Sequence, residues 1–118
     1  MLKIDLPYMP MNWNEYINAE RRSFYIANNI KQKEKVIVAS CCRGKVYDEG
    51  YPCKITFKAH YKHKRTDLDN LHIKGIVDGL VACKVLENDN LTKIQEITFK
   101  PVFDDKELLE IEIEKLDN

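Results

Sequence analysis

The stretch KITFKAHYK, residues 54–62, decides the architecture of this chain. Ile55, Phe57, Ala59 and Tyr61 alternate with polar residues over nine positions, and this strict alternation is typical of a strand with one packed face. The opposite face of the predicted strand carries polar and mostly basic side chains: Lys54, Thr56, Lys58, His60 and Lys62. The stretch therefore predicts a strand that packs on one side and presents positive charge on the other.

A sharp reversal of charge follows this strand. The segment RTDLDN, residues 65–70, places Asp67 and Asp69 at the end of a run rich in cations. The chain changes sign there, because residues 1–66 hold 13 Lys and Arg against 6 Asp and Glu, whereas residues 67–118 hold 6 against 13. Such a division indicates either a basic surface for a polyanion beside an acidic metal pocket, or solvated faces that the folded chain brings together.

The residues after this segment predict a helix, because apolar side chains recur at helical spacing from Ile73 to Val81. Asp69 or Asn70 is a suitable N-cap, and Asp89 lies in the turn that ends the helix. A helix of about 15 residues is about 22 Å long. Asp89 would then begin far from the two aspartates, unless the next strand starts beside them or a second subunit supplies the missing groups.

The remaining pattern completes a mixed α/β fold. The other predicted elements are a strand at Leu2–Leu6, one or two helices from Trp13 to about Cys41 with a weak point at Asn28–Asn29, a loop at Arg43–Pro52, and strands at Thr92–Val102 and Leu108–Leu116. In the last strand Leu109, Ile111 and Ile113 are expected to face inward, and the intervening glutamates are expected to face water. We expect a small mixed sheet packed against helices, in the order strand, helix or helices, strand, helix, strand, strand.

Length and composition favour one domain spanning residues 1–118. No apolar stretch is long enough to span a bilayer or to act as a secretory signal, so we expect a cytoplasmic protein. The four cysteines lack paired C-x-x-C spacing, and two of them are adjacent. This spacing suits neither a zinc cage nor a disulfide framework, and it favours reduced structural thiols.

Asp67 and Asp69 have two interpretations. One is a helix cap with an additional surface acid, because Asp and Asn are enriched at caps for local hydrogen-bonding reasons. The other is a metal site, since hard divalent ions take a few carboxylates together with water and phosphate oxygens, and Asp89 could be the third ligand. The basic residues that precede the segment favour the second interpretation, because they could hold a phosphate backbone against the carboxylates.

These residues carry a resemblance to a known family. Residues 51–71, YPCKITFKAHYKHKRTDLDNL, followed by Lys74, by Asp78-Gly-Leu and by Asn88-Asp89 ahead of a strand, resemble the RusA family of Holliday-junction resolvases, which is common in phages and prophages. The segment Leu6–Asn12 is similar to the proline-rich opening of that family. The match covers most of the chain, and its specific part is the ordered series D-x-D-N, Lys, D-x-L and N-D.

The resemblance implies a small α/β homodimer whose two sites make symmetrical nicks in a four-way DNA junction, using Mg²⁺ or Mn²⁺. Asp67, Asp69 and Asp89 would be the metal-binding acids, and Lys74 would be the catalytic lysine. The metal would lower the pKa of a bound water and neutralise charge on the scissile phosphate, while Lys74 would stabilise the transition state. The basic residues expected to hold the DNA backbone are Lys58, His60, Lys62, Lys64 and Arg65.

Two departures from the family pattern bear on Lys74. The family commonly spaces its lysine four residues after the second aspartate, whereas Lys74 lies five residues after Asp69, and Asp78 is displaced equally. We expect a bulge in the first helical turn to restore the register. With a regular helix, Lys74 would instead form a surface ion pair with Asp78, four residues away. The family's paired acids before the next strand are here Asn88 and Asp89, which favours Asp89 as the ligand.

Two other functions remain open on the sequence. A non-catalytic DNA-binding or phage assembly module of the same fold would tolerate the displaced lysine, whereas the three aspartates favour a nuclease. A nuclease acting on other branched DNA needs the same carboxylates as a junction resolvase. Trp13, Tyr16 and Phe24 lie at helical spacing, which predicts contacts in the core or in a dimer rather than stacking on bases.

Overall fold

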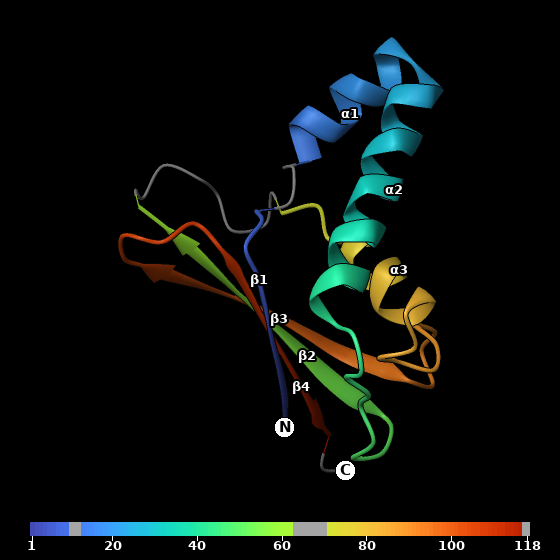
Figure 1. Cartoon of the computed structure of the whole chain (residues 1–118), viewed down its shortest axis with the longest axis vertical. Coiled ribbons are helices and arrows are strands. Elements are labelled where there is room, and N and C mark those ends of the chain that lie inside the picture. The colour runs from blue at the N-terminus through green and yellow to red at the C-terminus, as the bar shows by residue number, and fades with distance from the viewer. Residues whose placement is uncertain (10–12, 63–70, 117–118) are drawn as a thin grey trace.

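The computed structural model describes residues 1–9, 13–62 and 71–116, which form a four-stranded mixed sheet with three helices (Figure 1). The elements in chain order are β1 (Leu2–Leu6), α1 (Trp13–Arg22), α2 (Phe24–Cys41), β2 (Cys53–Tyr61), α3 (Lys74–Ala82), β3 (Ile94–Phe103) and β4 (Leu109–Lys115). The fold class and the order of elements predicted from the sequence are confirmed.

The strands lie in the order β1-β4-β2-β3. β4 is antiparallel to both of its neighbours, whereas β3 is parallel to β2 and is reached through α3. Alternation decides which side chains share a face: Ile55 lies beside Ile113 of β4 and beside Ile97 of β3. β2, which lies near the middle of the chain, is one of the two central strands of the sheet.

One face of the sheet packs against α2 and α3 (Figure 1). Val38 of α2 and Ile76 and Leu80 of α3 join the inward residues of the strands in a single core. The inward residues of the strands that are fully buried include Ile4, Leu6, Cys53, Ile55, Phe57, Ala59, Leu109, Ile111 and Ile113. The apolar alternation in β2 and β4 thus faces the helices, as the sequence predicts.

The helical region is interrupted at Ser23, between α1 and α2, and not at Asn28–Asn29. Ser23 has extended backbone angles, and its side-chain oxygen accepts a hydrogen bond from the Tyr25 N–H at 3.1 Å. This is the usual role of serine at a helix N-cap. Asn28 and Asn29 are tolerated inside α2 because both lie on its exposed side.

α2 and α3 approach each other closely at two glycines. A Cβ placed on Gly75 would lie 2.5 Å from Glu34 Oε1, and one placed on Gly79 would lie 2.9 Å from Val38 Cβ. Both distances are shorter than real contacts allow, so these positions need hydrogen in place of a side chain. The glycines therefore set the distance between α2 and α3.

Gly79→Ala should lower the free energy of unfolding by about 1–2 kcal/mol. The new methyl group would also lie 3.2 Å from Lys35 Cα, which is a backbone atom that cannot rotate away. This overpacking outweighs the gain in helix propensity. Urea unfolding would measure the change, with Asn29→Ala on the exposed side of α2 as the control. A Gly79→Ala variant as stable as the wild type would contradict the close approach.

Two further observations complete the fold. None of the four cysteines forms a disulfide, and Cys42 and Cys53 are buried, in agreement with structural thiols. In the part of the chain that the structure describes, no helix has the length and the apolar character needed to cross a membrane.

Candidate functional site

A pocket of about 840 Å³ lies between the α1–α2 pair, the first turn of α3 and the beginning of β3. Its polar wall includes Lys74 and Asp89, and its apolar wall includes Val77, Ile97 and Phe99. Leu71, His72 and Ile73, the residues that lead into α3, also line it. The pocket therefore collects side chains from two separate regions of the sequence, the α1–α2 pair and the stretch from Leu71 to Phe99.

Lys74, a predicted site residue, contacts two carboxylates, those of Asp78 and of the predicted ligand Asp89. Its Nζ atom lies 2.8 Å from Asp78 Oδ1 and 3.7 Å from Asp89 Oδ2. The hydrogen bond to Asp78, followed by the charges of both aspartates, raises the pKa of Lys74 above its usual value. The side chain is 57% exposed, so this ammonium group is charged and accessible to an incoming anion.

Asp89 reaches Lys74 because α3 is short. The helix has nine residues, about 13 Å, and not the 15 residues predicted. Lys84 has a positive φ of 65°, and the Val85 N–H donates to the Leu80 carbonyl at 2.9 Å, so the chain turns back immediately after the helix. The expectation that Asp89 begins far from Asp67 and Asp69 concerns two residues outside the described ones, but Asp89 does lie close to Lys74.

The turn after α3 is shaped by Asn88 and Asn90. The side-chain oxygen of Asn88 accepts hydrogen bonds from the backbone N–H groups of Asp89 and Asn90, at 2.7 and 3.1 Å. The side-chain oxygen of Asn90 accepts one from the Thr92 N–H at 3.0 Å. Asn88 is thus a turn-forming residue that leaves the Asp89 carboxylate directed to Lys74.

The first turn of α3 is regular, and the predicted bulge is not observed in it. The helix begins at Lys74 with Ile73 as its N-cap, no side chain caps it, and the Val77 N–H donates to the Ile73 carbonyl at 3.0 Å. The prediction of Asp69 or Asn70 as the N-cap is wrong, because the helix begins later. The regular helix with its Lys74–Asp78 ion pair is the arrangement predicted for the case without a bulge, and Asp89 lies beside this pair.

Several of the predicted site residues lie outside the described residues. These are Asp67, Asp69, Lys64 and Arg65. Among residues 1–9, 13–62 and 71–116, no group of three or more His, Cys, Asp or Glu side chains could hold a metal ion. Of the residues considered for the site, the structure brings together Lys74, Asp78 and Asp89. The carboxylate oxygens of Asp89 are of the kind that Mg²⁺ prefers.

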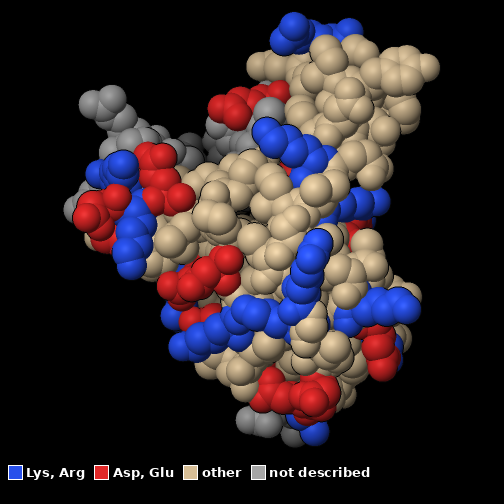
Figure 2. All heavy atoms as spheres, in the orientation of Figure 1, with Lys and Arg blue, Asp and Glu red and all other residues tan. Residues whose placement is uncertain are grey.

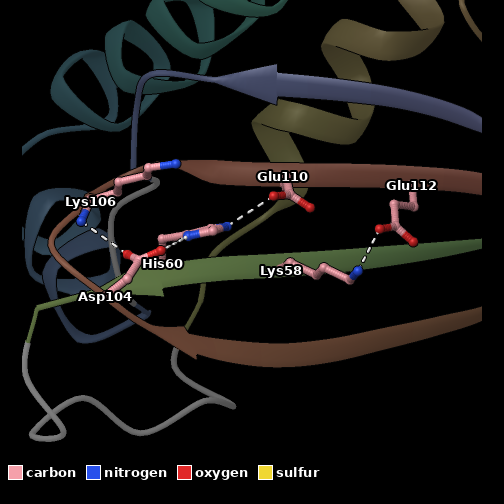
Figure 3. Close-up of polar contacts among 6 residues, drawn as sticks. All are labelled: Lys58, His60, Asp104, Lys106, Glu110 and Glu112. Atoms are coloured by element: carbon pink, nitrogen blue, oxygen red, sulfur yellow. Dashed lines mark hydrogen bonds and ion pairs between the residues drawn. The ribbon is translucent and has the colours of Figure 1, made fainter.

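The predicted DNA-binding face of β2 is engaged with carboxylates (Figure 3). Lys58 Nζ lies 2.6 Å from Glu112 Oε1 of β4. His60 lies between two acids, with Nδ1 2.8 Å from Asp104 Oδ2 and Nε2 3.1 Å from Glu110 Oε1. Further along the strand, Lys54 Nζ lies 3.6 Å from Glu96 of β3. The two halves of opposite charge thus meet on this face of the sheet, and Lys62 beyond the strand is exposed.

The sequence predicts that Glu112 faces water, and this prediction is wrong. It is only 7% exposed, because Lys58 and its neighbours cover it. The hydrogen bond from Lys58 lowers the pKa of Glu112, and the Lys106 N–H and His60 lower the pKa of Asp104. Hydrogen bonds to the ionised form explain both shifts. These carboxylates are therefore charged at neutral pH and compensate the cations of β2 in place.

Tyr16 and His72 form a buried stack at the pocket that the sequence does not reveal. Their ring centroids are 3.9 Å apart with an interplanar angle of 17°. Burial, together with the nearby Lys31, lowers the pKa of His72 below its usual value, so the imidazole is neutral at pH 7. The stack therefore gives the pocket a rigid aromatic wall that adds no charge.

Glu34 is a second residue that sequence reasoning missed. It lies in a lysine-rich stretch of α2 that is typical of a solvated helix face, yet it is fully buried against Gly75 of α3. Burial raises the pKa of Glu34 to about 7, and the interaction with the Tyr8 hydroxyl offsets only part of this effect. A carboxyl group that titrates near neutral pH therefore lies directly behind the first turn of α3.

Comparison with protein-family models and with curated proteins found no match to this chain.

Proposed function

We propose that this protein is a metal-dependent endodeoxyribonuclease that resolves four-way DNA junctions by paired phosphodiester hydrolysis. The observation that carries the proposal is the position of Asp89, whose carboxylate lies 3.7 Å from Lys74 although the two are 15 positions apart in the chain. A lysine beside a carboxylate in an accessible pocket has the composition that phosphoryl chemistry requires. Leu71 lines the same pocket, and Asp69 precedes it by two residues.

In this proposal Asp67, Asp69 and Asp89 hold Mg²⁺ or Mn²⁺. Their oxygens are hard ligands, which suits either ion. When bound, the ion supplies Lewis-acid polarisation of the scissile phosphate. Lys74 donates a hydrogen bond to a phosphate oxygen as negative charge develops there, and Asp78 holds the lysine ammonium in position. Val77, Ile97 and Phe99 line the apolar side of the pocket and reduce the access of bulk water.

Symmetrical cleavage needs two sites at a fixed separation, and a two-fold homodimer is the simplest assembly that supplies them. Lys62, Lys64 and Arg65 precede the carboxylate segment and would contact the phosphate backbone, which positions the DNA without reading its sequence. The expected setting is the cytoplasm of a bacterial host, with a phage or prophage origin.

Incubation with a mobile four-way junction should give paired nicks in the presence of Mg²⁺ and none with EDTA. A linear duplex of the same sequence should remain intact under both conditions. Denaturing gels of strands labelled one at a time would locate the nicks. Asp67→Asn and Asp69→Asn are the matched controls, because each removes one charge from the proposed metal site and leaves the rest of the chain unchanged.

The result also separates the alternatives. Junction binding without cleavage by the wild-type protein would favour a non-catalytic DNA-binding module. Cleavage of flapped or forked DNA at the same rate as the junction would favour a broader nuclease of branched DNA. Full activity of Asp67→Asn or Asp69→Asn would remove these residues from the metal site.

A further inference from the structure

In the described part of the chain, some of the positive charge that no ion pair engages lies on α1 and α2. Within residues 1–9, 13–62 and 71–116, the ion pairs engage Lys54 and Lys58 of β2, but none of Arg21, Arg22, Lys33 or Lys35. Both arginines are exposed at the end of α1. The helical pair therefore offers unpaired cations to a polyanion, whereas Lys54 and Lys58 of β2 are already paired with carboxylates.

α1 and the first half of α2 extend beyond the sheet, and their shared corner forms the outer end of this projection (Figure 1). Phe24 and Tyr25 lie at the corner and are 79% and 78% exposed. Their rings meet edge to face, with centroids 6.4 Å apart. We refer to residues 21–25, Arg-Arg-Ser-Phe-Tyr, as the aromatic corner. The sequence predicts that Phe24 contacts the core or a second subunit. Its exposure excludes the core.

The backbone of the aromatic corner is held firmly. The Ser23 N–H donates to the Ala19 carbonyl at 3.0 Å, and the Ser23 side chain accepts from the Tyr25 N–H at 3.1 Å. These bonds join the last turn of α1 to the first turn of α2. The two rings are therefore presented on a fixed backbone, which lowers the entropy cost of binding a partner.

Two adjacent exposed rings beside two guanidinium groups match the chemistry of unpaired nucleotides. Aromatic side chains stack on bases irrespective of sequence, and arginines bind the phosphates that link them. In Figure 2, which has the orientation of Figure 1, the outer end of the projection shows blue and tan atoms. A contact with a second copy across a two-fold axis is disfavoured, because it would bring the same arginines close to each other.

We infer that the aromatic corner binds DNA that carries unpaired bases, with Phe24 and Tyr25 stacking on the bases and Arg21 and Arg22 contacting phosphates. This inference rests on the proposed nuclease function. Lys31 of α2 lines the pocket, and Phe24 lies seven residues before it, about 10 Å along the helix. A strand with phosphates about 3.4 Å apart along the axis covers that distance in about three nucleotides. The corner thus lies within reach of a strand cleaved in the pocket.

The test compares the full-length wild type with the double variant Phe24→Ala/Tyr25→Ala. Fluorescence anisotropy would give the Kd for a four-way junction carrying unpaired 2-aminopurine bases at its centre, and for a linear duplex. The double variant should bind the junction about 10-fold or more weakly and the duplex almost unchanged, because base stacking is lost only where bases are unpaired. The wild type should quench the fluorescence of 2-aminopurine by stacking on it, and the double variant should not. Val36→Ala, which removes another exposed apolar side chain of α2, is the matched control.

A second variant, Arg21→Ala/Arg22→Ala, tests the phosphate contacts separately. It should weaken binding to both DNAs and should reduce the slope of log K against log salt by about two, one for each lost phosphate contact. Arg43→Ala, an exposed arginine at the opposite end of α2, is the control.

The outcomes distinguish this inference from the proposed function. If the wild type cleaves junctions and the aromatic variant binds them as tightly as the wild type, the inference is overturned and the nuclease remains. If the wild type binds no DNA, both are overturned. If sedimentation shows that the aromatic variant dissociates a dimer while its DNA affinity is unchanged, the corner is a protein contact and the inference is overturned.

Discussion

Lys74→Ala should lower the single-turnover rate of junction cleavage by about 10²- to 10³-fold and should leave the Kd for the junction within about 3-fold of the wild type. The ammonium group lies between Asp78 and Asp89 at the mouth of the pocket, where it can donate to a phosphate oxygen as charge develops. A group that acts mainly in the transition state affects the rate more than the affinity. Quenched-flow assays with excess enzyme would measure the rate apart from binding.

The matched control is Asp78→Asn. It removes the charge that pairs with Lys74 but keeps a hydrogen-bond acceptor at the same position, so the loss of rate should be below about 10-fold. An exposed ion pair four residues apart on a helix contributes little to stability, so neither variant should unfold. Equal rates for wild type and Lys74→Ala would reduce the lysine to a surface ion pair and leave the three aspartates as the whole of the catalytic assignment.

Glu34→Gln should raise the free energy of unfolding at pH 8 by about 3 kcal/mol and should leave it almost unchanged at pH 4. In the folded protein burial raises the pKa of Glu34 from 4.5 to about 7. The folded state therefore holds this proton more tightly than the unfolded state does. The stability associated with the neutral carboxyl group is complete below pH 4.5 and is lost as the pH rises to about 7. Glutamine has the same shape and never ionises, so it avoids this loss.

Urea unfolding between pH 4 and pH 9 would measure the effect of Glu34→Gln. Glu112→Gln is the matched control, because it makes the same substitution at another buried carboxylate whose pKa is lowered by Lys58. The sign is then opposite: Glu112 stabilises the fold above its ordinary pKa, and this contribution is lost as the pH falls. A Glu34→Gln variant that is less stable than the wild type at pH 8 would show that the buried carboxylate has a favourable partner.

The fold was predictable where alternation or spacing continues over a whole element. β2 and β4 show this most clearly, because each inward residue meets the core and a shift by one position would expose all of them. The end of α3 was not predictable from spacing. Val85 and Leu86 continue the apolar pattern and are buried, but they pack from a turn after the helix has ended. Apolar periodicity reports burial, and in a short segment it does not distinguish a helix from the turn that follows it.

The candidate site was predictable in part. The acidic turn at Asp89 and the helix start at Lys74 were identified from their order along the chain, but their proximity depends on how the chain turns after α3. The pairing of Lys58 with Glu112 depends on strand register, because the two residues lie 54 positions apart and β4 must lie beside β2. Nothing in the sequence distinguishes Glu34 from the solvated lysines around it, because its burial depends on tertiary packing.

The position of β4 between β1 and β2 has a consequence for synthesis on the ribosome. β4 follows both of these strands in the chain but lies between them in the sheet, so β1 cannot pair fully until its partners, residues 109–113, have been translated. Until then Ile4 and Leu6 lack the surface that buries them. The nascent chain also exposes its basic half before the acidic half exists, in surroundings rich in ribosomal RNA. The sheet is therefore completed only after β4 has been synthesised, and this strand brings both the missing hydrogen bonds and the Glu110 and Glu112 carboxylates that lie beside His60 and Lys58.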